Sequence, residues 1–581
     1  MWRLLFALLL LSPGMGSQRK LSAIDARREE TVGCGPGGAL VSAAAGGGLS
    51  APGAGGVSAS DAGVHFSPLF PGWGHYHYPI STWSDSAQYY FDQGLSLYYG
   101  YHLPEALASF REASLKDSSC AMTYWGQALA MGPYYNNTYS YKMPQDVAFA
   151  LEKMNRLKVT APARERDLAA AMNERYSSDL SDSRRPELNR AYSEAMKALI
   201  GKYPEDKDIK ALYVDGVMSE HAWDMYNPKG EPKPWTPELV RFCEEILEAD
   251  AYHPAALHYH IHLIEASYHP EKTLASADKL KDLMPGVPHM VHMASHTYQR
   301  MGLYAKGAFI NDSANAAQRV FVRVAGSRLG LSPDIIHYHA VEAYCALSGG
   351  MYRKASDEAQ ECRRIAKPRL RHSTTYLQYL YMMPVFVDIR MGQWQSILDR
   401  SVPDDSLGYA VILNDFARGL AFVRKGDVAA AGACLERIRA KKGDALLADP
   451  VKQGNPPVVG VAVAESILEG ELLFAQGKVA ESAAAFGRAI QTEDGMAYVE
   501  PKDWVLPARH FAGACLLKQG KAAEAEALYL EDLVHNPGSG WALLGLAQSL
   551  DAQKKNGAAE CRAKAAAAFA MAEMMPAGSA Y

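Results

Sequence analysis

The chain has 581 residues, with 59 Lys and Arg against 64 Asp and Glu, and a net charge of -5. This length exceeds what one compact core supports, so we expect several domains or an elongated repeat array. The slight acidic excess argues against a nucleic-acid-binding face, and the 48% hydrophobic share is ordinary for a folded protein.

The N-terminus has the pattern of a secretory signal. A positive charge precedes an eight-residue apolar run, Leu4 to Leu11, which predicts a signal peptide over residues 1–17; the alternative is an apolar first helix. Sequons of the N-x-[ST] type at Asn136 and Asn311 fit the same route, so we expect a secreted or lumenal protein. No later apolar stretch reaches the 18 or so residues of a membrane helix, and no membrane span is expected.

Residues 18–66 are rich in Gly, Ala and Ser, and we predict a disordered linker. The eight cysteines form no C-x-x-C motif and are too few for a disulfide scaffold. Most are expected to be small buried residues, although Cys345 with Cys362, or Cys515 with Cys561, could pair in an oxidising compartment.

Helical repeats of the tetratricopeptide type are predicted from residue 67 onward. In residues 87–120, the residues that interlock two helices stand at their template positions: Gly94, Ala106, Phe110 and Ala113. A repeat starting at residue 506 fills equivalent positions with Gly513, Ala525, Tyr529 and Pro537. The predicted fold is therefore an all-α, right-handed superhelix, with an N-terminal array over 67–350 and a C-terminal array over 351–581.

Histidines repeat at the period of the repeats themselves. His258 and His262 are four residues apart on one predicted helix face, and His292 and His296 follow 34 residues later. Seven of the 18 histidines lie within residues 258–296, where a uniform spread would give about one. Because helices at equivalent repeat positions are neighbours, we expect these four imidazoles to converge on one point.

Proline residues place the helices that carry these histidines. Pro254 is positioned to begin a helix with His258, His262 and Glu265 on one face, and Pro288 begins the next, with His289, His292 and His296 on one stripe. A third helix is expected after Pro333, where Asp334, His337 and His339 would add one imidazole, His337, and one carboxylate to the same groove.

Imidazole clusters of this kind are typical of zinc, copper or iron sites. The predicted metal ligands are His258, His262, His292, His296 and His337, with Glu265 as a further ligand or an orienting partner. Two alternatives remain at this point: a polar ladder that stabilises the superhelix, and a pH sensor.

A smaller cluster, His75-Tyr76-His77-Tyr78, precedes the first repeat. Its alternation indicates an extended segment with both imidazoles on one side, either a ligand source or an aromatic lead-in.

Several segments resemble a family of large tetratricopeptide-repeat proteins with paired H-x-x-x-H helices. The similar segments are Ala87 to Gly94, Tyr124 to Leu129, His258 to His262 and His292 to His296. The resemblance covers roughly residues 70–350 and implies an α-α superhelix with a histidine-rich centre; it supplies no reaction. Members of that family carry His-Asn-x-His in a third helix, of which only His337 is kept here.

Two functions are compatible with these patterns. The first is a binding module whose concave groove holds a protein or peptide partner, with a metal site in the central repeats. The second is a metal-dependent oxidoreductase or hydrolase, in which Glu265, Tyr298 and Arg300 are the catalytic candidates. Motifs of other enzyme classes, such as H-E-x-x-H, G-x-S-x-G and the Walker loop, are missing.

Overall fold

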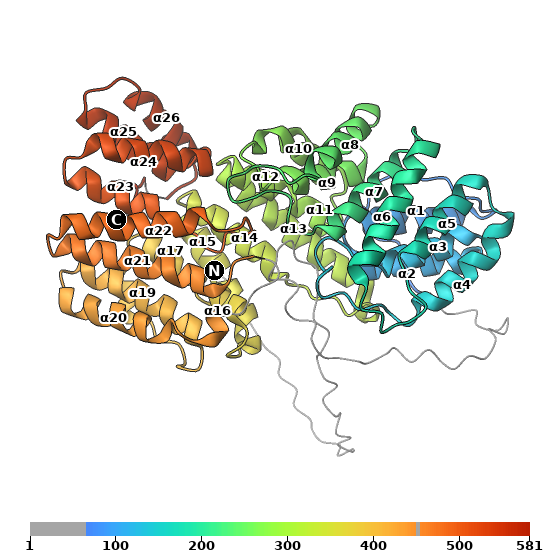
Figure 1. The fold of residues 1–581 in the computed structure, drawn as a ribbon, viewed down its shortest axis with the longest axis horizontal. Coiled ribbons are helices and arrows are strands. Elements are labelled where there is room, and N and C mark those ends of the chain that lie inside the picture. Colours follow the sequence, from blue (N-terminus) through green and yellow to red (C-terminus); the bar gives the residue numbers. More distant parts are fainter. Residues whose placement is uncertain (1–64, 449–453, 574) are drawn as a thin grey trace, which may run out of the picture.

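The computed structural model describes residues 65–448, 454–573 and 575–581. Within these ranges the chain is an array of antiparallel helix pairs, and the only β-structure is an isolated bridge between Tyr226 and Pro232. Figure 1 shows the N-terminal helices at one end, the C-terminal helices at the other and α9 to α13 between them. The predicted tetratricopeptide-type superhelix is confirmed.

The N-terminal helices are α1 (Asp85–Tyr99), α2 (Leu103–Lys116), α3 (Ala121–Ala130), α4 (Val147–Leu157), α5 (Ala163–Glu174), α6 (Arg185–Lys202), α7 (Lys207–Glu220) and α8 (Thr236–Ala249). The central helices are α9 (Pro254–Ile264), α10 (Leu274–Leu283), α11 (Pro288–His292), α12 (Ala294–Arg300), α13 (Tyr304–Ala325), α14 (Ile336–Ser348) and α15 (Tyr352–Ala366). The C-terminal helices are α16 (Thr375–Tyr381), α17 (Met383–Arg390), α18 (Trp394–Asp399), α19 (Gly408–Arg424), α20 (Val428–Lys441), α21 (Pro457–Ala475), α22 (Val479–Asp494), α23 (Ala508–Lys518), α24 (Ala522–His535), α25 (Gly540–Ala552) and α26 (Ala558–Ala568).

Glycines let neighbouring helices interlock around one large side chain. Phe110 on α2 packs between α1 and α3, and a Cβ atom placed on Gly94 or Gly126 would lie 2.8 or 2.3 Å from its ring. Tyr529 on α24 lies in the same way between Gly513 and Gly545. The large residue at one template position therefore requires glycine on both neighbouring helices.

The C-terminal helices also reach back to the central repeats. The Trp541 indole N–H on α25 donates to the carbonyl of Ser348 at 2.9 Å, and the Arg300 guanidinium donates to the carbonyl of His535 at 3.0 Å. Gly302 and Gly538 touch through their backbones, since a Cβ on Gly302 would lie 2.7 Å from Gly538. This contact brings residues about 200 positions apart to the histidine-rich centre.

The structure can be compared with several features that relate to the predicted secretory route. The predicted signal and most of the predicted linker lie in residues 1–64, outside the described residues. Asn136 and Asn311 are buried, so neither sequon is accessible to a glycan in the folded chain. The described cysteines are free thiols, and neither predicted pairing is formed. None of the helices in the described ranges combines the length and apolarity needed to span a membrane.

The packing around Phe110 gives a stability prediction. We expect Gly126→Ala to lower the free energy of unfolding by about 1–3 kcal/mol, because the new methyl group overlaps the Phe110 ring. Gly487→Ala on α22 is the matched control: its Cβ meets open space, so better helix propensity should raise stability by up to about 1 kcal/mol. Thermal denaturation followed by circular dichroism measures both, and equal shifts would contradict the interlocking role of Gly126.

Candidate metal centre

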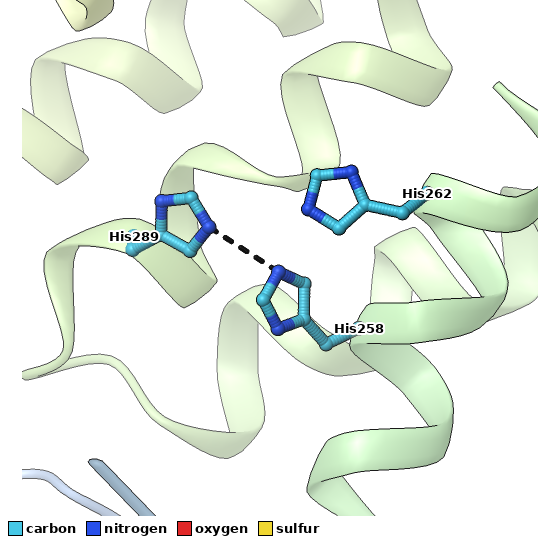
Figure 2. A group of neighbouring side chains, drawn as sticks. All are labelled: His258, His262 and His289. Carbon is cyan, nitrogen blue, oxygen red and sulfur yellow. Dashed lines mark hydrogen bonds between the residues drawn. The ribbon is translucent and has the colours of Figure 1, made fainter. Parts of the chain in front are cut away.

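Six imidazoles gather in two groups at the centre of the array. Triad 1 consists of His258 and His262 from α9 and His289 from α11, shown in Figure 2. Triad 2 consists of His292 from α11, His296 from α12 and His337 from α14. Within each triad, one nitrogen from every ring lies within 4.8 Å of the other two. All six side chains are buried, with at most 5% of the residue surface exposed.

The local sequence explains how α9 presents its two histidines. Pro254 begins this helix, as predicted, and the His253 imidazole caps it by accepting from the Ala256 amide at 3.3 Å. Every residue of α9 is buried, which is the pattern of a helix covered on all sides. His258 and His262 therefore face protein and not solvent.

The five predicted ligands all belong to the triads. His289, which shares the stripe of His292 and His296 on the sequence, completes triad 1. The imidazoles of His289 and His292 lie three residues apart on α11, with ring centroids 6.1 Å apart. One short helix thus serves both triads, and a third close group, His262, Glu265 and His296, takes one ring from each of them.

Hydrogen bonds fix the tautomers in triad 1. The Nδ1 atom of His258 lies 2.6 Å from the Tyr99 carbonyl oxygen, which can only accept, so Nδ1 carries the proton and Nε2 carries a lone pair. The Nδ1 atom of His262 donates to the Glu265 carboxylate at 3.0 Å. Its Nε2 atom is buried and has no hydrogen-bond partner. Burial lowers the pKa of the His258 imidazole well below its usual value, so the Nε2 atom of His258 is unprotonated.

Triad 2 repeats this pattern. The Nδ1 atom of His292 donates to Asn311 Oδ1 at 2.6 Å, and the amide of Asn311 is oriented by its bond to the Gly307 carbonyl. The Nδ1 atom of His296 donates to Glu265 at 2.8 Å. Burial lowers the pKa of the His292 imidazole well below its usual value, and the neighbouring His296 lowers it further, so the ring is neutral.

Two Nε2 atoms lie close together inside each triad. Those of His292 and His296 are 2.8 Å apart, and those of His258 and His289 are 3.2 Å apart. When His292 and His296 both carry their proton on Nδ1, two lone pairs face each other and no proton lies between these atoms. Such lone pairs repel unless a cation lies near both, and nitrogens bound to one tetrahedral zinc lie about 3.3 Å apart.

Glu265 connects the two triads. One carboxylate oxygen accepts from His262 and the other from His296, and the Arg300 guanidinium donates to the backbone carbonyl of Glu265 at 3.0 Å. Burial opposes ionisation of this carboxyl group, but the imidazoles of His262 and His296 lower its pKa to about 2. Glu265 is therefore an anionic partner that orients one ring of each triad, as outer carboxylates do at metal sites.

A second carboxyl group comes from the C-terminal half. Glu500, between α22 and α23, contacts Nδ1 of His296 and accepts from the Gln299 side chain at 2.8 Å. Burial, and then the charge of Glu265, raise the pKa of Glu500 well above its usual range. Sequence reasoning missed this residue because no motif or period relates it to histidines 200 positions earlier.

Aromatic rings enclose the triads. The ring of Tyr101 lies 4.6 Å from that of His258, Tyr135 lies 5.0 Å from His262, and Tyr338 is stacked 4.5 Å from His292. These rings keep water away from the imidazoles, and the low polarity of the surroundings favours their neutral form.

Two of the predicted catalytic candidates do not face the triads. The hydroxyl of Tyr298 donates to Asp278 on α10. The guanidinium of Arg300 is committed to the carbonyls of Glu265, Ser267 and His535. Both were predicted from closeness in sequence to His296, but the helix turns their side chains away from the imidazoles.

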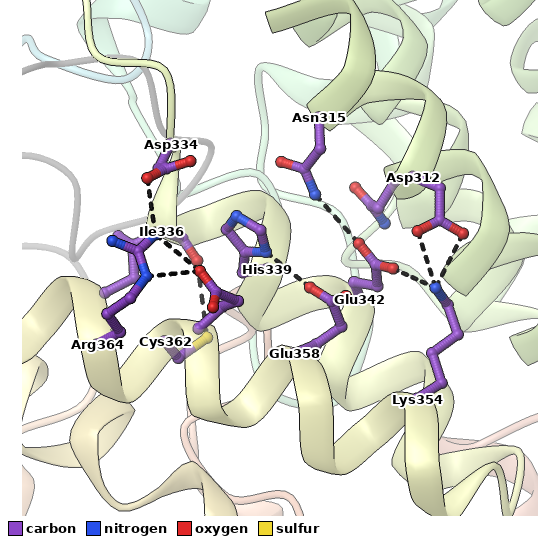
Figure 3. A network of polar contacts seen from close by, with 12 residues as sticks. Asp312, Asn315, Asp334, Ile336, His339, Glu342, Lys354, Glu358, Cys362 and Arg364 are labelled. Carbon is purple, nitrogen blue, oxygen red and sulfur yellow. Dashed lines mark hydrogen bonds and ion pairs between the residues drawn. The ribbon is translucent and has the colours of Figure 1, made fainter. Parts of the chain in front are cut away.

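The predicted carboxylate of Asp334 is likewise absent from the groove, because it pairs with Arg364 at 2.7 Å (Figure 3). His339 points away from His337 and donates to Glu358 at 2.6 Å. The two exposed histidines before α1 also stay outside both triads, and His77 bonds Asp92 at 2.7 Å. The N-terminal segment instead inserts Tyr76, which bonds Asp208 and His253.

The network in Figure 3 holds α14, and with it His337, between α13 and α15. Lys354 on α15 pairs with Asp312 on α13 at 2.8 Å and with Glu342 on α14, and Asn315 donates to Glu342 at 3.2 Å. His339, Glu342 and Glu358 are close enough to hold an ion, but the Lys354 ammonium already supplies a cation there.

Comparison with known proteins identifies repeat proteins of similar architecture. No family model and no curated protein matches the chain. The human IFIT1 dimer with m7Gppp-AAAA is 13% identical, with 84% of this chain and 96% of that chain covered and a TM-score of 0.34. Yeast Tom70 is 12% identical, with 81% and 96% covered and a TM-score of 0.29. Similarity this low transfers no ligand to this chain, and the predicted lack of a nucleic-acid ligand gains no support from it.

His260 allows a test of burial in this region. It points away from the triads and bonds Ser276 at 2.9 Å, and burial, then Lys272, lower its pKa to about 4. The unfolded chain takes up this proton near pH 6.5, so the folded state loses stability as the pH falls from 6.5 to 4, by up to about 3 kcal/mol. Glutamine takes up no proton, so His260→Gln does not lose stability in this way. We expect the variant to melt below the wild type at pH 7 and the difference in melting temperature to be smaller at pH 5. A gap that is independent of pH would contradict the assignment.

Proposed function

We propose that the chain is a metalloprotein that binds two transition-metal ions in its central repeats, one in each triad. The observation that carries this proposal is the gathering of three buried imidazoles in each triad, with the Nε2 atoms of His292 and His296 2.8 Å apart. A polar ladder would place a proton between such nitrogens. A pH sensor would need rings that are protonated near neutral pH, whereas burial lowers the pKa of His258, His289 and His337 well below 6.5.

The donor set favours zinc, copper or iron. Each triad offers three imidazoles and no thiolate or carboxylate, which is a borderline ligand set with no negative charge. Copper binds most tightly to such sites among the divalent ions of the first transition row. The carboxylate of Glu265 accepts from the Nδ1 atoms of His262 and His296, which leaves their Nε2 atoms for the ion. Its negative charge would balance part of the charge of the ion.

Three protein ligands for each ion favour chemistry over a purely structural role. Structural zinc sites are usually filled by four protein ligands, whereas catalytic sites keep one position for water or substrate. A metal-dependent oxidoreductase or hydrolase is therefore the function that the geometry supports best. In such an enzyme, Tyr99, Asn311 and Glu265 hold the imidazole protons at Nδ1, and the aromatic rings exclude bulk water.

Binding of a protein or peptide partner is a second candidate. An open hollow of about 520 Å³ lies between residues 73–79 and the first turns of α7 and α9, and Tyr76, Asp208 and Tyr252 line it. The carboxyl groups on its wall outnumber the basic side chains of Arg164 and Lys207, which suits a basic peptide segment. A secreted or lumenal location stays a prediction from the N-terminal sequence.

Metal content tests the proposed centre. After loading with Zn²⁺ or Cu²⁺ and desalting, we expect about two ions per wild-type chain by elemental mass spectrometry. His289→Ala and His337→Ala should each retain about one, because each variant leaves the other triad intact. The double variant His262→Ala/His296→Ala should retain almost none.

His269→Ala, which changes an exposed histidine near α9, is the matched control and should keep both ions. Circular dichroism verifies that each variant is folded. Metal content that is equally sub-stoichiometric in the wild type and in the double variant would refute the metal centre.

An open coordination position has its own signature. Azide added to the Cu²⁺-loaded protein should give a new ligand-to-metal absorption band, since a small anion can occupy the fourth position. An unchanged spectrum with two bound ions would indicate filled, structural sites.

A further inference from the structure

A cavity of about 100 Å³ lies where the C-terminal helices meet the central repeats. Its wall includes the end of α12, the segment 496–504 and the end of α24, together with residues 227–228, Ala266, Tyr268, Asn455, the end of α22 and Arg509. A narrow recess shares Arg300, Tyr498, Lys502 and Asn536 with this cavity and extends to Gln299. The cavity lies outside both triads, and neither of the two functions proposed above involves it.

Two cations line this cavity without a carboxylate partner. Arg300 is 6% exposed and makes three bonds, all to backbone carbonyls, which leaves two of its five N–H groups. The half-buried Lys502 ammonium donates to the side-chain oxygen of Asn536. No carboxylate of the described residues lies within 4 Å of either group.

The two positive charges also repel each other. Burial and then the charge of Arg300 lower the pKa of Lys502 to about 8. Two buried like charges are stable together only when an anion or strong acceptors compensate them. Carbonyl and amide oxygens supply part of this compensation, and an anion between the two cations would supply the rest.

The acidic groups of the cavity wall have other partners. Asp494 forms a paired contact with Arg509 at 2.6 and 2.8 Å, and Asp503 accepts two bonds from Asn455. Glu493 accepts from the Ala508 amide at 2.8 Å. Each of these carboxyl groups therefore has a hydrogen-bond partner other than Arg300 and Lys502, although the charges of Glu493 and Asp532 still raise the pKa of Lys502 and offset part of its repulsion by Arg300.

Size and polarity limit the ligand. A volume of about 100 Å³ holds roughly three water molecules or an organic ion of a few heavy atoms. Beside the cations the wall is apolar and aromatic, with Met496, Tyr498, Val499 and Trp504. A planar carboxylate on a short hydrocarbon chain matches both parts, since guanidinium groups bind carboxylates through two parallel N–H groups.

We propose that this cavity binds a short-chain carboxylate, with its anionic group between Arg300 and Lys502 and its hydrocarbon part against Tyr498 and Trp504. The site adjoins the proposed metal centre, because Gln299, at the end of the recess, donates to Glu500, which contacts His296. The link to the metal centre rests on the proposed metal function, whereas the carboxylate site itself does not. A bound anion would alter the charge next to Glu500 and so the surroundings of one triad 2 ligand.

Propionate is the test ligand, titrated into metal-free and Cu²⁺-loaded full-length protein and followed by ligand-observed NMR. We expect Lys502→Met to weaken propionate binding at least about tenfold, since it removes a charged donor, and Lys502→Arg to restore it to within about threefold. Lys521→Met, which removes an exposed lysine before α24, is the matched control and should bind as wild type does. All three variants should keep the wild-type metal content.

Three outcomes would overturn the carboxylate site: no binding of propionate to the wild type, equal binding by Lys502→Met, or tighter binding of phosphate than of propionate through Lys502. The link to the metal centre has a separate readout. Propionate should shift the Cu²⁺ EPR spectrum of the wild type and leave that of Lys502→Met unchanged; no shift would overturn the link. Propionate binding that depends on Lys502 in a protein that holds no metal would support the cavity and refute the metal centre.

Discussion

The commitment of one nitrogen to a fixed acceptor, on the rings of His258, His262, His292 and His296, organises the centre. An imidazole can offer a lone pair toward a common point only if its proton is held elsewhere. The Tyr99 carbonyl, the Asn311 side chain and the Glu265 carboxylate each hold one or two such protons. Each acceptor is itself held: by the end of α1, by a bond to Gly307, or by Arg300 behind Glu265. The lone pairs are thus oriented before any ligand arrives.

The repeat architecture explains why the centre is double. Successive first helices of a solenoid present equivalent positions to one groove, so a histidine pair that recurs after one repeat produces two neighbouring sets of rings. The short helix α11 then divides its own histidines, His289 toward one set and His292 toward the other. Glu265, at the C-terminal end of α9, lies between the sets and is shared by them.

Much of this arrangement could be predicted from the sequence because it is periodic. The 34-residue period predicted the helices and four of the six rings, and His337 was included although its spacing departs from the period. The division into two triads could not be predicted, since it depends on how far α11 rotates about its axis. Tyr298 and Arg300 show the same limit, because closeness in sequence to His296 does not determine which groups their side chains contact. Glu500 depends on long-range closure of the array, for which the sequence carries no local signal.

The contact of Glu500 with His296 also implies an order in which parts of the centre assemble during synthesis. All six imidazoles lie between residues 258 and 337 and leave the ribosome well before residue 500. Domains fold as the chain emerges, from the N-terminus onward. The rings can therefore assemble while the side later covered by residues 498–502 is still open. Packing of the last helices then covers this side, so the C-terminal part of the chain encloses the triads last.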